Sequence, residues 1–191
     1  MTHRLPNVVL LLASVMTVGP VGAIQPVNAP STLPTQADVE AVYLFDFGKF
    51  VRWPSGVDRG PFQICVAATH SFAAGVERTI ANEAIDGRTL TVREISRPEE
   101  ETGCAVLFID ASERERSDVL LRGAADKPLL TVSDLPDFLA RGGMIQFQII
   151  QNRVRFSVNL DAVNRSHLVM SSELLKVAVD VKGRAEQGGA P

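Results

Sequence analysis

Three short apolar segments place the strongest constraint on the fold of this chain. They are Phe62–Ala68, Cys104–Ile109 and Leu129–Val132. Each is too short for a typical core helix, and a short apolar run is typical of a strand that is buried on both faces. The sequence therefore predicts three central strands in a sheet whose two faces are both covered.

Helical patterns follow the first two of these segments. Ser71 is expected to cap a helix that runs to about Asn82. Ser112 and Glu115 form a capping box for a second helix, which is expected to end near Gly123. Strands that alternate with helices in this way predict an α/β fold with a mostly parallel sheet.

The C-terminal third departs from this alternation. Asp134 and Pro136 are expected to open a short helical turn. Beyond it, Met144–Leu160 alternates apolar and polar residues on both sides of Gln151-Asn152, which predicts an antiparallel hairpin. Leu168–Val181 has the apolar spacing of an amphipathic helix.

The fold class follows from these patterns. We predict a three-layer α/β sandwich with a mostly parallel mixed sheet, flavodoxin-like or Rossmann-like, that ends in an antiparallel hairpin and a C-terminal helix. Arg88–Ile95 alternates as a strand with one wet face does and is expected near a sheet edge. Only Ser96–Gly103 separates it from the next strand, fewer residues than a parallel crossover usually needs. The strand order therefore stays open.

The N-terminus has the pattern of a secretory signal. His3 and Arg4 give a positive start, Val8–Val18 is apolar, and Val21-Gly22-Ala23 offers a small-residue cleavage site. The apolar run is too short to cross a bilayer core, which needs about 20 residues. We expect residues 1–23 to be a cleaved signal peptide, and the protein to be periplasmic and not membrane-spanning.

The mature chain is expected to hold one domain. Residues 24–36 contain three prolines and no charge and are expected to form a disordered leader, whereas residues 182–191 are expected to form a disordered tail. Residues 37–181 then form a single domain of ordinary size. The whole chain has 19 Lys and Arg against 22 Asp and Glu, with the signs interspersed, so nucleic acid is not an expected partner.

Aromatic residues crowd the first helix of this domain. Asp38–Trp53 is expected to be helical, and Pro54 to stop the helix. Phe45 lies away from the apolar face, and Trp53 stands at the end of the helix. Core packing is one interpretation of these two side chains, and a contact surface is the other. The apolar face is expected to contain Val39, Val42, Tyr43, Phe47, Phe50 and Val51.

The titratable residues give little support to catalysis. The mature chain keeps His70 and His167, and neither lies beside a nucleophile motif. His70 follows the first predicted strand, at the end where open α/β sheets commonly bind ligands. A solvated loop histidine is the alternative interpretation. We find no metal-ligand spacing and no phosphate-binding loop, so we expect no catalytic residue, no metal site and no cofactor.

The chain contains two cysteines, Cys65 and Cys104. Export places them in an oxidising compartment, and they belong to two predicted strands that are candidates for neighbours. We predict a disulfide bond between them, with two buried thiols as the alternative.

A set of short segments lies in one order and spacing along the domain. The segments are Phe45-Asp46-Phe47-Gly48-Lys49-Phe50-Val51-Arg52-Trp53-Pro54, Ile64-Cys65-Val66, Cys104, Leu130-Thr131-Val132-Ser133-Asp134, Gly142-Gly143-Met144-Ile145, Val154-Arg155-Phe156-Ser157-Val158-Asn159-Leu160 and Ser171-Ser172-Glu173-Leu174-Leu175-Lys176. In this order and spacing they resemble the YfiR-like family of periplasmic proteins, over about residues 38–180. The sequence departs from the family pattern in two places: Phe45-Asp46 replaces the usual Tyr-Asn, and one cysteine pair is present where some members have two.

The resemblance implies a non-enzymatic periplasmic regulator. Such a protein binds the periplasmic part of an inner-membrane diguanylate cyclase and holds it inactive, which affects cyclic-di-GMP and biofilm formation. A sensor kinase is the other expected kind of partner, and a homodimer stays open. Met144, Asn159 and Leu168, in the hairpin and the last helix, are candidates for partner contact, with core, turn and sheet roles as the alternative.

Two other functions remain as alternatives. A periplasmic small-ligand-binding module would bind its ligand around Thr69 and His70, beyond the strand ends. An exported hydrolase would need one of the two histidines as its base.

Overall fold

The computed structural model describes residues 33–55 and 60–183. The expected signal peptide, residues 24–32 of the expected leader and residues 184–191 of the expected tail lie outside the described residues. The described chain begins just before helix α1 (Gln36–Phe50), which Thr35 caps by accepting a hydrogen bond from the backbone N–H of Asp38.

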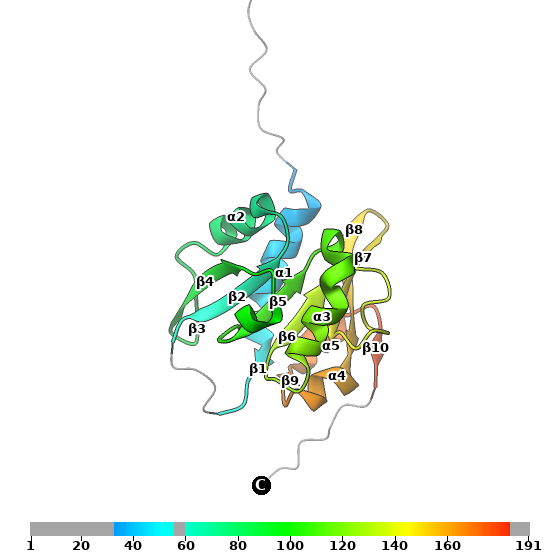
Figure 1. Ribbon diagram of the computed structural model, residues 1–191. Coiled ribbons are helices and arrows are strands. Elements are labelled where there is room, and N and C mark those ends of the chain that lie inside the picture. Colours follow the sequence, from blue (N-terminus) through cyan, green and yellow to red (C-terminus); the bar gives the residue numbers. More distant parts are fainter. Residues whose placement is uncertain (1–32, 56–59, 184–191) are drawn as a thin grey trace, which may run out of the picture. The chain divides into compact units, whose positions relative to one another are not determined.

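An eight-stranded mixed sheet lies at the centre of the described part of the chain (Figure 1). Its strand order is β10-β8-β7-β6-β5-β2-β4-β3. The five strands β4-β2-β5-β6-β7 are parallel and repeat the flavodoxin-like order 2-1-3-4-5. The strands are β2 (Phe62–Ala67), β3 (Ala84–Ile85), β4 (Arg88–Glu94), β5 (Val106–Ile109), β6 (Leu130–Ser133), β7 (Ile145–Ile150), β8 (Arg153–Asn159) and β10 (Val181–Lys182).

The central strands divide their side chains between two hydrophobic cores. Ile64 and Val66 of β2 join the core under α1 and α2 (His70–Thr79). Cys65 and Ala67 point the other way, into the core under α3 (Arg114–Ala124). Figure 1 shows α1 and α3 on opposite faces of the sheet. The α/β class and the three layers predicted from the apolar runs are confirmed.

The connection between β4 and β5 settles the strand order. Residues 95–105, which include the 3₁₀ turn η1 (Pro98–Glu101), carry the chain past β2, so that β4 and β5 lie on its two sides. A short connection therefore makes a parallel crossover without a full helix.

The first helix ends earlier than predicted, and two of the six residues of its predicted apolar face are exposed. It ends at Phe50, because Val51–Arg52 (β1) pairs with Val169–Met170 (β9) in a separate two-stranded sheet. Its buried residues include Ala41, Leu44 and Phe47. The predicted apolar face is wrong at two positions, since Val42 and Phe50 are exposed.

Two predicted helix starts are also wrong. Thr69, and not Ser71, caps α2 by accepting a hydrogen bond from the N–H of Phe72. The capping box at Ser112 does not form: Asp110 accepts from the N–H of Ser112 and opens the 3₁₀ turn η2 (Ala111–Glu113), from which α3 continues.

The hairpin is confirmed, with Phe147 opposite Phe156. Gln151 and Asn152 both have positive φ, 49° and 59°, as a tight turn between right-twisted strands requires.

The prediction of one long C-terminal helix over Leu168–Val181 is wrong. The chain instead forms α4 (Leu160–Arg165), β9, a shorter helix α5 (Ser172–Val177) and β10. Within the predicted span, Val169–Met170 pairs as strand β9 and Ser171 caps α5, so the helix begins only at Ser172. Lys182, placed in the expected tail, belongs to β10.

An aromatic cluster fixes α1 on the sheet. The Phe47 ring centroid lies 5.2 Å from that of Phe156, 5.9 Å from that of Phe147 and 5.8 Å from that of Tyr43. Phe47 is fully buried, so its removal leaves a cavity that its neighbours fill only in part.

We expect Phe47→Ala to lower the free energy of unfolding by about 3–5 kcal/mol. Phe50→Ala, the same change at an exposed position of α1, should lower it by less than about 1 kcal/mol. Equilibrium urea unfolding of the two variants measures the difference. Equal losses would contradict the packing described for α1.

Candidate functional site

A disulfide bond ties the crossover to the central strand. Cys65 of β2 is bonded to Cys104, with 5.8 Å between the two Cα atoms. This is the pairing predicted from the sequence. It attaches the end of residues 95–105 to β2, next to the start of β5.

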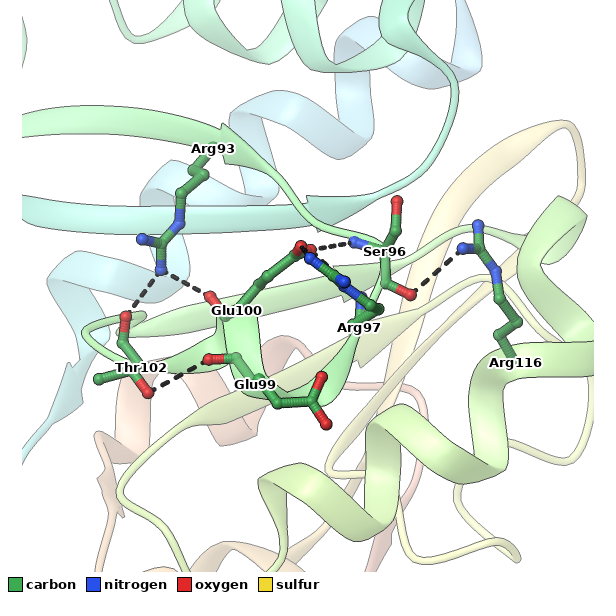
Figure 2. Close-up of polar contacts among 7 residues, drawn as sticks. All are labelled: Arg93, Ser96, Arg97, Glu99, Glu100, Thr102 and Arg116. Atoms are coloured by element: carbon green, nitrogen blue, oxygen red, sulfur yellow. Dashed lines mark hydrogen bonds and ion pairs between the residues drawn. The ribbon is translucent and has the colours of Figure 1, made fainter.

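Arg93 of β4 holds the same segment from the other side. Its Nη2 donates to the carbonyl oxygens of Glu100 and Thr102, both at 2.7 Å, and lies 3.4 Å from the Sγ of Cys104 (Figure 2). These loop carbonyls have no backbone hydrogen-bond partner in a described strand or helix. The hydrogen bonds from the guanidinium group therefore hold the loop backbone in place.

Glu100 organises the first half of the crossover. Its carboxylate accepts from the backbone N–H of Ser96 at 2.7 Å and from Arg97 Nη2 at 2.8 Å. These hydrogen bonds hold the pKa of Glu100 below its ordinary value. Arg116 of α3 donates to the Ser96 carbonyl at 3.2 Å. The loop is therefore attached to both β4 and α3 (Figure 2).

Glu101 is the buried carboxyl of this segment. It is 2% exposed, neither of its carboxylate oxygens has a hydrogen-bond partner in the described structure, and Lys127 Nζ lies 3.6 Å from Oε2. Burial raises its pKa to about 7, against the opposing charge of Lys127. Gly123 makes room for it, since a Cβ there would lie 2.8 Å from Oε2.

We expect Cys65→Ala/Cys104→Ala to lower the free energy of unfolding by about 4 kcal/mol, the loop-closure entropy that the bond removes from the unfolded chain. Urea unfolding of the double variant measures this loss. Wild-type protein unfolded with a reducing agent present should match the variant. An unchanged urea midpoint would contradict the role given to the bond.

Three acidic residues lie at the carboxyl edge of the parallel strands. Asp110 follows β5, Asp134 follows β6, and Glu40 reaches them from α1. Glu40 is 3% exposed, and its Oε1 accepts from Gln36 Nε2 at 2.8 Å. The Oδ1 of Asp134 is buried without a hydrogen-bond partner among the described residues.

Burial and neighbouring charge raise the pKa of two of these carboxyl groups. Burial raises the pKa of Glu40 to about 7, and the charges of Asp134 and Asp110 add to this effect. The pKa of Asp134 is also raised, first by burial and then by Asp110. Within residues 33–55 and 60–183, no group of three or more His, Cys, Asp or Glu is placed to hold a metal ion.

We expect Glu40→Gln to stabilise the protein increasingly as the pH rises. Between its ordinary pKa of 4.5 and its folded pKa of about 7, Glu40 binds a proton in the folded state that the unfolded state has released. Wild-type stability therefore falls as the pH rises through 7. The gain from Glu40→Gln should grow by on the order of 2 kcal/mol between pH 4.5 and pH 8.

Urea unfolding at both pH values measures this gain. Glu77→Gln, at an exposed position of α2, is the control and should show no such growth. A gain that is the same at both pH values would contradict the position given to Glu40.

His70 lies at the same edge but away from the carboxyl group of Glu40. Its Nδ1 is 2.5 Å from Glu94 Oε1, at the end of β4, and its side chain is 85% exposed. Thr69 beside it is used as the cap of α2. His70 is therefore an exposed member of an ion pair at the strand ends.

The two aromatic candidates of the first helix differ in environment. Phe45 is half-buried against the core, and Lys49 Nζ lies 4.2 Å above its ring. Trp53 packs edge-on against Phe62, with 5.1 Å between ring centroids, and its Nε1 is buried without a partner in the described structure. Both have core contacts.

The C-terminal candidates lie mainly in the interior. Met144 and Leu168 are buried core residues. Asn159 is half-buried, caps α4 through its Oδ1 and donates from Nδ2 to the Leu139 carbonyl at 3.2 Å. Direct contact with a partner through Met144 or Leu168 would need the core to open.

Exposed apolar side chains lie near these buried residues. We call them the C-terminal surface: Ile149, Ile150, Val177 and Val179. Val177 and Val179 are 58% and 50% exposed. The N–H of Val179 donates to the carbonyl of Phe156 at 2.8 Å, so this segment runs along β8. A hollow of about 310 Å³ beside it is lined by Gln146, Gln148, Ser157, Val179, Asp180 and Lys182, among others.

Sequence reasoning missed the acidic residues and the C-terminal surface. Asp110 and Asp134 directly follow two predicted parallel strands, a signal that places them at one edge. The burial of Glu40 is harder to recognise from the sequence. The indication is its place four residues before the apolar Leu44, on the same side of the helix. Val177 and Val179 fall within the single long helix that the sequence predicts, whereas the observed helix α5 ends at Val177, so the pattern does not indicate their exposure.

No helix among the described residues has the length and apolar character that crossing a bilayer requires.

Comparisons with known proteins agree with this fold. The family described as YfiR/HmsC-like (DUF4154) matches residues 37–179, most of the chain. A conserved domain protein from Vibrio cholerae O1 biovar El Tor str. N16961 superimposes with a TM-score of 0.53 at 9% sequence identity, over 77% of this chain and 60% of that one. The chain thus spans less than two thirds of that protein, and the likeness shows the fold alone.

A second solved structure, the ABC domain from Streptococcus pneumonia in complex with L-Trp, gives a TM-score of 0.44 at 12% identity, over 63% of this chain and 55% of that one.

Proposed function

Because this chain belongs to the YfiR/HmsC-like family of periplasmic regulatory proteins, we propose that it is a non-enzymatic periplasmic regulator of an inner-membrane signalling protein. The partner is a diguanylate cyclase, bound through its periplasmic part and held inactive, so that the regulator lowers cyclic-di-GMP and biofilm formation. The family match across almost the whole domain is the observation that carries this proposal.

Features of the chain itself support export. The N-terminal residues have the order of a secretory signal. The Cys65–Cys104 bond is of a kind that persists in oxidising compartments. Both agree with a periplasmic location, where the protein meets the outer parts of inner-membrane sensors.

The C-terminal surface is the proposed contact region. Its four aliphatic side chains are exposed at three places: Ile149 and Ile150 at the end of β7, Val177 at the end of α5, and Val179 in the segment leading to β10. Exposed aliphatic groups beside a polar hollow match the apolar centre and polar rim of a protein interface. Asn159 and Leu168 support this surface from below by capping α4 and filling the core.

The proposal as a whole is tested in the source bacterium. Deleting the gene for this chain should raise cellular cyclic-di-GMP and biofilm, and a copy with its signal sequence should restore both. A copy without residues 1–23 should not restore them. If deletion changes neither quantity, and purified protein recovers no cyclase or kinase from membranes, the proposal is wrong.

A small-ligand module remains the second candidate function. It is favoured by the raised pKa of Glu40 and Asp134 at the strand ends, since perturbed carboxyl groups in this position often mark binding sites. A ligand that binds there should raise the melting temperature of wild-type protein, and Glu40→Gln should reduce that shift.

We expect Ile150→Asp/Val179→Asp to weaken binding to the periplasmic part of the partner at least about tenfold, or 1.4 kcal/mol, because the variant places charge in the apolar part of the contact. Calorimetric titration of the two purified proteins measures it. Val42→Asp, at an exposed position on α1, is the matched control. If the wild type and the double variant bind the partner with equal affinity, the C-terminal surface is not part of the interface.

A further inference from the structure

A second hollow, of about 390 Å³, lies at the opposite end of the sheet from the acidic residues. Thr131, near the start of β6, and Met144, just before β7, form part of its lining. Leu121 of α3 and Ala162 of α4 add further apolar wall. Its volume is within the range of small-molecule sites, about 300–1,000 Å³.

Three arginines line this hollow from three separate elements. Arg122 is in the last turn of α3, Arg165 is in the last turn of α4, and Arg141 precedes β7. Arg141 Nη1 is paired with Asp118 Oδ1 at 2.8 Å. In the part of the chain that the structure describes, Arg122 and Arg165 form no ion pair.

Acidic groups offset this charge in part. Asp118 and Asp126 also line the hollow, and Asp118 is already paired with Arg141. The partial negative charge at the C-terminal ends of α3 and α4 stabilises Arg122 and Arg165 in the last turns of these helices. Counted as side chains, three guanidinium groups face two carboxylates, which leaves an excess of hydrogen-bond donors.

A serine adds a further polar group. Ser166 lines the hollow and is 3% exposed as a residue. A serine hydroxyl can donate one hydrogen bond to a ligand oxygen, beside the guanidinium donors.

From this arrangement we infer that the hollow between α3 and α4 binds a small organic anion through its phosphate or carboxylate group. Arg122 and Arg165 donate to the oxyanion, since a guanidinium group matches either kind of oxyanion in two parallel hydrogen bonds. Ser166 donates one more hydrogen bond, and the carbon part of the ligand packs on the half-buried Leu121. The inference does not depend on the proposed partner.

The site is tested by titrating the purified mature protein with three probes at constant ionic strength. The probes are inorganic phosphate, glycerol 3-phosphate and succinate, followed by calorimetry and by amide NMR. We expect saturable binding of at least one probe, with chemical-shift changes at the ends of α3 and α4. Binding of the phosphates alone assigns a phosphate ligand, binding of succinate alone assigns a carboxylate, and binding of all three supports a general oxyanion site.

Three variants locate the site and separate the effect of charge from that of hydrogen-bond geometry. Arg122→Gln/Arg165→Gln should lower the affinity at least tenfold. Arg52→Gln/Arg78→Gln removes the same charge from exposed positions elsewhere, Arg78 being in the last turn of α2, and should keep the affinity. Arg165→Lys keeps the charge but loses the two-pronged donor, so it should weaken binding by a smaller factor. It also serves if the double variant fails to fold.

The inference is wrong if no probe binds saturably to wild-type protein. It is equally wrong if the two double variants lose affinity alike, because that indicates attraction to net charge only. Shift changes confined to the surroundings of His70 would place the anion at the other end of the sheet and overturn it as well.

Discussion

The short crossover between β4 and β5 is the constraint on which the rest of the sheet depends. It must carry the chain past β2 within residues 95–105, without a helix long enough to pack on the sheet by itself. Arg93 and the Cys65–Cys104 bond supply the attachment that a packed helix would otherwise provide. The position of β5 then fixes Asp110 at the carboxyl edge and directs the chain into α3, on the other face.

How far the sequence predicts the fold depends on the range of the interactions that form each element. The buried strands and the hairpin were predictable, because apolar runs and the Gln151-Asn152 turn are local signals. The end of α1 was not, because Val51–Arg52 becomes a strand only by pairing with Val169–Met170, more than a hundred positions away. The same pairing helps to break the predicted C-terminal helix.

The candidate sites show the same division. Cys65 and Cys104 were predictable as a pair, because each lies in or beside an apolar strand segment. Glu40 was not, since its raised pKa arises from burial against groups that follow β5 and β6. Arg122 and Arg165 come from helices more than forty positions apart, and α4 itself begins where the sequence predicts the end of a strand. Helix ends of this kind have little periodic signal for sequence reasoning to use.

Different titratable groups at the two ends of the sheet give this fold two chemically different surfaces. The carboxyl edge holds Glu40, whose pKa is raised by burial to about 7, and Asp134, whose pKa is raised by burial as well. The amino edge presents Arg122 and Arg165, whose charge is constant over the physiological range. The C-terminal surface comes from the end of β7, the end of α5 and the chain entering β10. Met144, just before β7, belongs to the lining of the arginine-lined hollow, so the hollow and the exposed residues of β7 lie at opposite ends of that strand.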